Sequence, residues 1–367
     1  MTDRVLIIGG AGRIGSSVAQ DLIAHTDAKI TITGRHLDAG MALSSKLGSK
    51  VEFLALDLAD KEGLRAVIAT AGLVIHCAGP FHYRDANVLK TCIEQGVDYL
   101  DVSDHRSFTC KALEYKSAAE SAGITAVVNS GIFPGISNSM VLQGVEQLDT
   151  ADRIHLSYVV AGSGGAGVTV MRTTFLGLRT PFEAWIDGRW QTVKPYSDRE
   201  TIQFPAPYGR TGVYWFDMPE TFTLPDTFPA KTVITKFGTV PDFYNYLTWS
   251  VAHWWPASWL RNPKVIEFLA QVSHRMTDFT DNFSGVGVAI RSEITGQKQG
   301  QPASYCSTLI HNNTTLAAGV GTGTIAELIL AGKLKKPGVW VVEQALPTHL
   351  FEQVIESRGL KIYGEWM

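Results

Sequence analysis

The chain has few cysteines, and they do not form the pairs that metal or redox sites use. Four cysteines occur among 367 residues, and no two of them stand in a C-x-x-C motif. Their positions are Cys77, Cys92, Cys110 and Cys306. This scatter predicts neither a zinc site nor a disulfide framework. We therefore expect no metal and a reducing, cytoplasmic location.

The chain also lacks a strong charge and a clear membrane span. Its formal net charge is −3 and it has no long basic run, which argues against nucleic acid as a partner. Residues 243–260 carry no formal charge, but they include Asn245, His253 and Pro256, which are costly in hydrocarbon. The aromatic residues of this stretch suit a buried wall, a dimer interface or peripheral contact with a membrane. Because the chain starts directly with a strand-like run, we expect no signal or transit peptide.

The first third of the chain alternates short apolar runs with helix-like segments. A chain of 367 residues favours two domains over one. Six runs read as strands, at residues 4–8, 29–33, 51–58, 73–78, 99–102 and 125–128. Near-continuous apolar strands that alternate with helices indicate a parallel sheet covered on both faces. The fold class that we predict is α/β, with a Rossmann-type doubly wound sheet.

The pattern changes after residue 135. Long alternating runs and an Asp187-Gly188 turn indicate a mostly antiparallel sheet, and seven of the nine tryptophans lie between Trp185 and Trp259. Helix-like periodicity returns from residue 314, followed by an expected turn at 337–340 and a helix at 347–357. We therefore predict a dinucleotide-binding domain of residues 1–135 plus 314–367. Residues 136–313 would form an inserted α+β domain for substrate and for homodimer formation.

A glycine-rich segment separates the first expected strand from the first expected helix. Gly10, Gly12 and Gly15 satisfy the pattern G-x-G-x-x-G in that position. One glycine permits the tight turn, the next lets the backbone approach a pyrophosphate, and the last lets helix and strand pack closely. The helix N-terminus then offers N–H groups and a positive dipole end to the phosphates. We predict a dinucleotide site that includes Arg13 and Ile14.

The residue after the second expected strand indicates which dinucleotide binds. Arg35 stands where a dinucleotide fold places the side chain that meets the adenosine ribose. An acid there would accept the 2′-hydroxyl of NAD, whereas an arginine suits the 2′-phosphate of NADP. Arg13 in the glycine-rich turn would add a second cation. We predict NADP(H) rather than NAD, and the alternative for Arg35 is a solvated loop arginine.

Small and polar residues follow three further strands at the same sheet edge. Ala78, Gly79 and Pro80 end the fourth strand, and small residues there let a ribose lie against backbone. Ser130 ends the sixth strand, where we expect the nicotinamide. For Pro80 the alternative is an ordinary turn.

Candidates for proton transfer follow the fourth and fifth strands. Asp104 and His105 place a carboxylate beside an imidazole, which could move a proton when a hydride is delivered. Tyr83, just after the fourth strand, could donate a proton to a developing oxyanion. The alternatives are a helix cap or a loop hydrogen bond for the first two and a packed loop aromatic for Tyr83. Cys77 lies in an apolar strand and is expected to be an inert thiol.

Several motifs together resemble the saccharopine dehydrogenase superfamily. These are Gly9–Gly15, His76–Phe81, Cys92–Ser103 and the C-terminal run from Gly332 to Glu343. The resemblance implies a nucleotide domain built from the N-terminal part and the C-terminal helices, with a second α+β domain inserted between them. It also implies that Asp57 contacts the adenine edge, although Asp57 could instead cap the following helix.

The resemblance implies an NADP(H)-dependent oxidoreductase and leaves the reaction open. The superfamily contains enzymes that join or split secondary amines, a branch similar to enoyl reductases, and members at lipid droplets. The aromatic middle region favours a large apolar ligand, so we expect an apolar small-molecule substrate such as a lipid or isoprenoid carbonyl or enone. One alternative is an opine- or polyamine-type imine reductase, which would need a basic carboxylate pocket. A second is a non-catalytic NADP-binding sensor or scaffold at a lipid surface.

Overall fold

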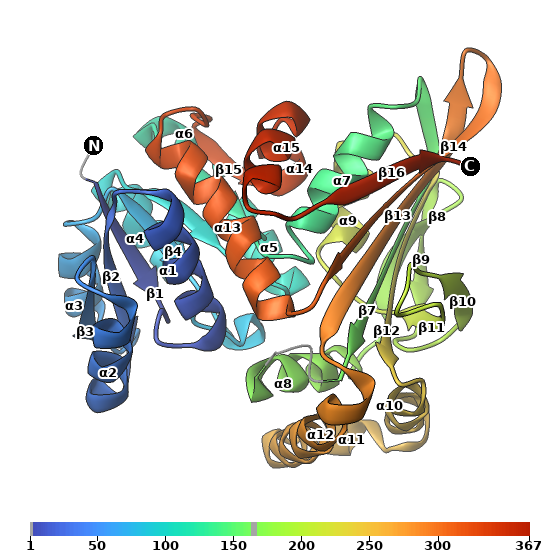
Figure 1. Ribbon diagram of the computed structural model, residues 1–367, viewed down its shortest axis with the longest axis horizontal. Coiled ribbons are helices and arrows are strands. Elements are labelled where there is room, and N and C mark those ends of the chain that lie inside the picture. The colour runs from blue at the N-terminus through green and yellow to red at the C-terminus, as the bar shows by residue number, and fades with distance from the viewer. Residues whose placement is uncertain (1–2, 163–166) are drawn as a thin grey trace. The chain divides into compact units, whose positions relative to one another are not determined.

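The chain folds into two compact units (Figure 1). The structure, a computed structural model, describes residues 3–162 and 167–367, and it describes only the backbone of residues 282–284. The first unit comprises Met1–Ile136 and Thr315–Arg358, and the second comprises Ser137–Thr314 and Gly359–Met367. The last nine residues differ from our prediction, which placed all of residues 314–367 in the nucleotide domain. They belong to the second unit because strand β16 pairs with its sheet.

The first unit is built on a parallel sheet of seven strands in the order β15-β6-β5-β4-β1-β2-β3. The strands are β1 (Arg4–Ile8), β2 (Lys29–Gly34), β3 (Val51–Ala55), β4 (Leu73–His76), β5 (Asp98–Asp101), β6 (Thr125–Val128) and β15 (Gly338–Val341). Strand β1 lies between β2 and β4, so the chain reverses its direction of progress across the sheet at β1/β4. Open α/β sheets bind ligands at such a reversal, outside the carboxyl ends of the strands. The predicted α/β Rossmann-type fold is confirmed.

Helices cover both faces of this sheet. They are α1 (Arg13–His25), α2 (Leu37–Leu47), α3 (Lys61–Ile68), the 3-10 turn η1 (Phe81–Tyr83), α4 (Asn87–Gln95), α5 (Arg106–Leu113), α6 (Lys116–Ala122), α13 (Thr314–Leu330), α14 (Val342–Ala345) and α15 (Thr348–Ser357). Helices α1 and α13 lie side by side (Figure 1). They pack so closely that a Cβ on Gly319 of α13 would lie 2.2 Å from the Ser17 hydroxyl of α1.

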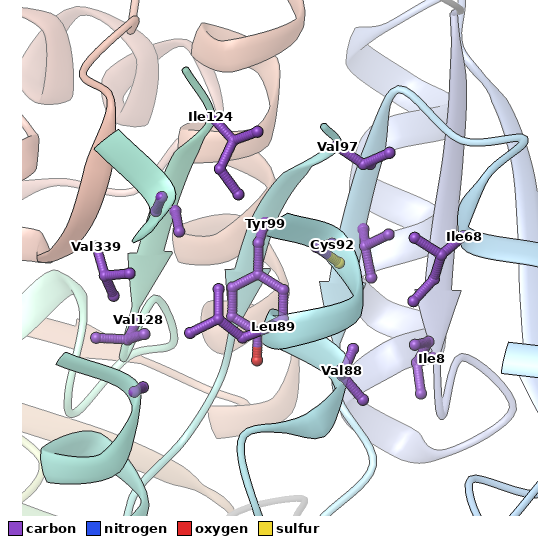
Figure 2. Packing of buried hydrophobic residues seen from close by; sticks show 14 of the residues in the cluster. Ile8, Ile68, Val88, Leu89, Cys92, Val97, Tyr99, Ile124, Val128 and Val339 are labelled. Atoms are coloured by element: carbon purple, nitrogen blue, oxygen red, sulfur yellow. The ribbon is translucent and has the colours of Figure 1, made fainter. Parts of the chain in front are cut away.

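The main core of the first unit lies on the opposite face, between the sheet and α3 to α6 (Figure 2). Ile68 from α3 and Leu89 and Cys92 from α4 are fully buried against Ile8 and Tyr99 of the strands. Burial of side chains of this size contributes about 1.5–3 kcal/mol each relative to exposure. The core fixes the strand ends, and therefore the loops that follow them.

Two local predictions in this unit are wrong. The expected turn at residues 337–340 contains most of β15, because Gly338–Val341 pairs with Thr125–Val128 of β6 and extends the sheet by one strand. The sequence between the fifth and sixth expected strands predicts one helix over about residues 109–122, but the structure has two helices there, α5 and α6, separated at Glu114 and Tyr115.

The second unit is built on a mostly antiparallel sheet of seven strands in the order β10-β11-β12-β7-β13-β14-β16, in which only β12 and β7 are parallel among the pairs of described strands. The strands are β7 (Thr150–Ala161), β10 (Glu200–Gln203), β11 (Arg210–Trp215), β12 (Thr232–Val240), β13 (Gly287–Lys298), β14 (Gln301–His311) and β16 (Ile362–Trp366). A separate hairpin consists of β8 (Phe182–Ile186) and β9 (Arg189–Val193). Its predicted turn is confirmed, since Asp187 and Gly188 both have positive φ, as a type I′ turn requires.

The helices of the second unit include a group of three that follows β12. The helices are α7 (Ile136–Val145), α8 (Val168–Gly177), α9 (Glu220–Thr227), α10 (Phe243–Trp254), α11 (Ala257–Leu260) and α12 (Pro263–Ser284). No helix among the described residues is long and apolar enough to cross a membrane. The expected α+β character of this region is confirmed.

Candidate functional site

The glycine-rich turn connects β1 to α1 at the reversal point of the parallel sheet. The Gly12 amide donates to the Gly9 carbonyl at 2.9 Å, which closes the turn. Gly12 is also the N-cap of α1, so it has no side chain to cover the first N–H groups of the helix. A Cβ on Gly12 would lie 3.1 Å from the Gly9 oxygen. The turn therefore offers an anion an uncovered helix N-terminus.

The other glycines of the turn permit close backbone contacts. A Cβ on Gly15 would lie 2.5 Å from the Gly9 oxygen and 2.6 Å from the Gly10 Cα, so helix and turn could not pack as they do. Gly9 has a φ of +75°, and a Cβ on it would lie 2.8 Å from the backbone of Ala78. The loops after β1 and β4 thus touch, which brings the predicted residues Gly10, Gly12 and Ala78 to one edge of the sheet. This arrangement fits the phosphates and ribose of a dinucleotide.

The predicted recognition residues Arg35 and Asp57 follow β2 and β3 and are exposed. The Asp57 carboxylate accepts the Ala59 amide at 3.0 Å, whereas Asp60 caps α3 by accepting the Gly63 amide at 2.9 Å. The helix-cap alternative for Asp57 is therefore wrong. Its carboxylate lies in the loop at the same edge as Arg35.

Sequence reasoning missed a further arginine at this edge, Arg84, beside the predicted Arg35 and Arg13. The Arg84 Nε donates to the Ala78 carbonyl at 2.7 Å, which fixes the guanidinium over the end of β4. Partial burial lowers the pKa of Arg84, and the nearby charge of Arg35 lowers it further. Two cations thus converge where the 2′-phosphate of NADP is expected. Only the three-dimensional path of η1, between Gly79-Pro80 and Arg84, brings this residue back over the strand.

Ser130 lies in a hydrogen-bond network between β5 and β6. Its hydroxyl donates to the Asp101 carbonyl at 2.7 Å, and its amide donates to the same oxygen at 2.8 Å. Asp101 is fully buried and accepts hydrogen bonds from Ser103, Asn129 and Tyr99. Burial nevertheless raises the pKa of this carboxyl. The network ties β5 to β6, and we assign no cofactor contact to the Ser130 hydroxyl.

Two histidines form a hydrogen-bonded pair beyond the ends of β4 and β5. The Nδ1 of His82 lies 2.9 Å from the Nε2 of His105, and the Nδ1 of His105 lies 2.9 Å from the Ser107 hydroxyl. The His82 ring also contacts Tyr83 edge-on, with the ring centroids 4.9 Å apart. Asp104 directly precedes His105 and is half-buried. The structure therefore brings the predicted Tyr83 and His105 together through a residue that the prediction left out, His82.

A pair of this kind can pass a proton. A hydrogen bond between two imidazoles requires one nitrogen with a proton and one without it. Protonation at one ring therefore shifts the proton of the other, and the Ser107 hydroxyl extends the chain. The spacing of 23 residues between the two histidines gives no local signal in the sequence. Only the adjacency of β4 and β5 brings them together.

The buried thiol and the histidine beside it are not suited to reaction. Burial raises the pKa of Cys77 far above its ordinary value, which disfavours the thiolate. Burial also lowers the pKa of His76 to about 3, so its imidazole is neutral between Phe81 and Phe108. Among the residues that the structure describes, no group of three or more histidine, cysteine or acidic side chains could hold a metal ion.

The second unit carries a charged cluster that the sequence did not reveal. Lys236 is fully buried in the middle of β12, and its ammonium donates to the Asp198 carboxylate at 2.8 Å and to Glu200 at 2.6 Å. Glu200 also lies 3.5 Å from His155 of β7. Two arginines of this unit are paired with acids, since Arg172 binds Glu267 and Arg199 binds Asp242.

The glycine-rich turn, the uncovered helix N-terminus and the cations at the strand ends agree with a family match. Residues 5–127 match the family described as the saccharopine dehydrogenase NADP-binding domain. Residues 5–127 therefore form an NADP-binding domain of the saccharopine dehydrogenase type. The predicted resemblance is confirmed over these residues, and the protein is an NADP(H)-dependent oxidoreductase. Its NADP(H) preference agrees with Arg35.

Relatives of this oxidoreductase extend across both units. Carboxyaminopropylagmatine dehydrogenase of Synechocystis sp. is 27% identical, over 94% of this chain and 93% of the relative. Carboxynorspermidine synthase of Vibrio cholerae is 23% identical, over 96% of this chain and 94% of the relative. The fold is similar to that of apo saccharopine dehydrogenase (L-Glu forming) from Saccharomyces cerevisiae, with a TM-score of 0.70 at 16% identity and 99% coverage of both chains.

Proposed function

We propose that this oxidoreductase is an NADPH-dependent imine reductase of the polyamine type, which forms a C–N bond between an amine and a carbonyl compound. The observation that supports this function is the near-full-length similarity to relatives named for carboxylated polyamines. That similarity includes the second unit, where we expect the substrate to be chosen. It favours the imine-reductase alternative over the apolar carbonyl or enone that the aromatic region suggested.

The name of the Synechocystis relative indicates the substrate class. It describes an agmatine carrying a carboxyaminopropyl group. A secondary amine of this kind forms when a primary amine condenses with an aldehyde, with loss of water, and the resulting imine takes up a hydride at carbon and a proton at nitrogen. We propose that this chain acts on a primary amine of the polyamine class and an aldehyde that bears an amino group and a carboxylate.

The residues at the edge of the parallel sheet have distinct proposed roles. NADPH, when bound, supplies the hydride. The glycine-rich turn holds the pyrophosphate, and Arg35 with Arg84 neutralises the 2′-phosphate. Ala78, Gly79 and Pro80 leave room for the ribose, and Asp57 lies toward the adenine. We expect the reaction itself at the loops that carry Tyr83 and His105.

The histidine pair would donate and accept the protons that the reaction needs. Loss of water from the condensation adduct needs an acid, and the nitrogen needs a proton after reduction. We assign the proton transfer to the His82–His105 pair as a unit, with the Ser107 hydroxyl at the His105 end and Tyr83 beside His82. General acid–base groups of this kind contribute about 10²–10⁴-fold to a rate.

The decisive experiment follows NADPH oxidation with amine–aldehyde pairs. Agmatine and simple diamines would each be combined with an aldehyde that bears an amino group and a carboxylate, and omission of either partner is the control. We expect turnover only when both partners are present. Turnover with a dispersed lipid extract, and none with any amine–aldehyde pair, would contradict the proposal. That result would favour an apolar carbonyl or enone as the substrate.

The proton-transfer assignment has its own variants. We expect His82→Gln and His105→Gln to lower kcat by about 10²–10⁴-fold and to remove the same limb of the pH–rate profile. NADPH binding should stay unchanged. His349→Gln, an exposed position on α15, is the matched control. An unchanged pH profile in both variants would show that the pair has no part in proton transfer.

A further inference from the structure

The loop after β5 brings His105 to the candidate site, and His105 is also the residue that precedes helix α5. Its backbone is extended, with φ −131° and ψ 124°, and its imidazole makes no cap hydrogen bond to the helix. The ring lies instead within hydrogen-bond distance of His82 and Ser107. The place of this imidazole therefore depends on how firmly the backbone of the loop is held.

The carbonyl of His105 fixes the end of this loop to α5. It accepts the amides of Phe108 and Thr109, both at 3.1 Å, and the Thr109 hydroxyl at 3.3 Å. Thr109 is fully buried, so its hydroxyl must find its partners within the protein. Because the hydroxyl gives its one proton to the His105 carbonyl, its oxygen is left to accept from another donor.

Asn129, which directly follows β6, supplies that donor. Its side-chain amide donates to the Thr109 hydroxyl at 2.9 Å, and to the carbonyl and the hydroxyl of Ser103, both at 2.8 Å. A carbonyl can only accept, so the nitrogen of the amide, and not its oxygen, faces Ser103. The Asn129 amide thus holds the loop at two points, directly at Ser103 and through Thr109 at His105.

A second branch of this network ends on Asp101. The Ser103 hydroxyl donates to the Asp101 carboxylate at 2.6 Å, which leaves the hydroxyl oxygen to accept from Asn129. The backbone amide of Asn129 donates to the same carboxylate oxygen at 2.9 Å. The proton directions are therefore consistent throughout, since both branches start at the Asn129 amide and end on an acceptor.

The backbone at Asn129 limits which residue can do this. Its φ is +64°, in the left-handed region that glycine, asparagine and aspartate adopt most readily. Glycine has no side chain, and an ionised aspartate has no proton to donate. Asparagine is thus the one of these three residues that can donate to both Ser103 and Thr109 from this buried position, where Asn129 is 1% exposed.

We propose that Asn129 is a positioning residue, which holds the loop after β5 so that the imidazole of His105 meets that of His82. It acts through Ser103 and Thr109 rather than on the reacting atoms. Its importance for turnover rests on the proposed function, in which the histidine pair transfers protons. The hydrogen bond between the two imidazoles can be measured without turnover.

The test is NMR of the full-length enzyme labelled with nitrogen-15 histidine. A scalar coupling between the His82 Nδ1 and His105 Nε2 nuclei is the signature of the hydrogen bond that joins them. We expect this coupling in the wild type and its loss in Thr109→Val, which keeps the shape of the side chain but removes the hydroxyl. Thr109→Ser keeps the hydroxyl and should restore the coupling. Asn129→Asp keeps a residue that tolerates the left-handed backbone, removes the donors, and should also lose the coupling.

A matched control separates this role from general loosening of the unit. Thr125 is buried at the start of β6, and its hydroxyl accepts the Lys336 amide at 2.9 Å. Thr125→Val therefore removes a buried threonine hydroxyl at the other end of the same strand, and it should keep the imidazole coupling. Absence of the coupling from the wild type, its persistence in Thr109→Val, or an equal loss in Thr125→Val would each overturn the proposal.

Kinetics connect the hydrogen bond to the reaction. Thr109→Val should lower kcat about 10–100-fold, because a displacement of about 1 Å can cost about 10²-fold in rate. It should also shift the limb of the pH–rate profile that His82→Gln and His105→Gln remove, and leave NADPH binding and the KM for the amine unchanged. An unchanged kcat and pH profile in a variant that has lost the coupling would overturn the positioning role. A wild type that shows the coupling but reduces no imine would contradict the proposed function alone, since the coupling is measured without substrate.

Discussion

The two seven-stranded sheets of this oxidoreductase bury different kinds of residue. The parallel sheet has strands of four to six residues, and it buries apolar side chains such as Leu6 and Val74 between helices. The mixed sheet has strands of up to twelve residues and buries Lys236, His155 and Ser157 within them. The first sheet buries His76 and Asp101 at the last residues of their strands, whereas the second buries Lys236 and His155 in mid-strand.

This difference explains why functional residues are easier to predict from the sequence in the first unit than in the second. A loop at a strand end is marked in the sequence by glycine, proline and polar residues, so the cofactor site of the first unit can be located before the fold is known. A lysine in mid-strand is unremarkable in the sequence. Its importance follows from partners that lie 36 and 38 residues away.

The largest predicted effect concerns the buried charge of the second sheet. Asp198→Asn combined with Glu200→Gln would leave Lys236 buried without a counter-charge, which costs about 3–5 kcal/mol of unfolding free energy. Lys236→Met should cost less, because Asp198 and Glu200 retain access to water. The measurement is urea unfolding followed by tryptophan fluorescence. The control is Asp152→Asn, which breaks an exposed pair with Lys231 and should cost less than about 1 kcal/mol.

The same pair has a defined pH dependence. The hydrogen bond from Lys236 lowers the pKa of Asp198 in the folded state. Its contribution to stability is therefore complete above the ordinary aspartate pKa of about 4, and it is lost as the pH falls through the lower folded value. If Lys236→Met and wild type keep the same difference in Tm below pH 4 as at neutral pH, this ion pair does not stabilise the sheet.

A smaller effect would sharpen the assignment of the first sheet. Arg35→Asp should weaken NADPH binding about 10–100-fold relative to NADH, since a charge-assisted contact to the 2′-phosphate contributes about 1.5–3 kcal/mol. Fluorescence titration with both nucleotides gives this ratio. Arg65→Asp, an exposed arginine on α3, is the control that changes the same net charge. Equal losses of affinity for NADPH and NADH would mean that Arg35 does not bind the 2′-phosphate.

The smallest effect compares the buried histidine of each sheet. Burial lowers the pKa of His76 to about 3, and burial with the charge of Arg153 lowers that of His155 to about 3. The unfolded chain takes up a proton below pH 6.5 and the native imidazole does not, so stability falls as the pH decreases from 6.5 toward 3. Each histidine should cost about 1.4 kcal/mol at pH 5.5 relative to pH 7.5.

Thermal unfolding at these two pH values tests the comparison. His76→Leu should flatten the pH dependence of the first unit, and His155→Leu that of the second. His349→Gln should change neither. If the pH dependence persists in the double variant, other groups dominate the acid response.

Nearly every strand of the first sheet could be predicted from the sequence. The prediction failed for segments that become strands only because they pair with a strand distant in the sequence. Strand β15 was taken for a turn because Pro337 and Gly338 signal one locally, yet the edge of β6 recruits the segment as a strand. Strand β16 was missed for the same reason, since Ile362–Trp366 has little pattern of its own and is ordered by β14.

The residues of the candidate site also divide into those that local sequence spacing predicts and those that only the folded chain brings together. Gly10, Gly12, Gly15 and Arg35 could be predicted from spacing alone, because the first three lie in one short turn and Arg35 directly follows a strand. The His82–His105 pair and the return of Arg84 over Ala78 depend on how η1 folds back across the strand ends. Ser130 was predicted as a cofactor residue because it follows a strand, and its hydrogen bond to the Asp101 carbonyl could not be seen in the sequence.

The final strand has a consequence for how the enzyme avoids aggregation. Strand β16 covers five residues at the open edge of β14 and satisfies backbone groups that would otherwise be available to another chain. It is short, and it carries Glu365 near its end, two features that make an edge strand a poor template for further pairing. Strand β16 thus protects this edge of the second sheet from pairing with a strand of another molecule.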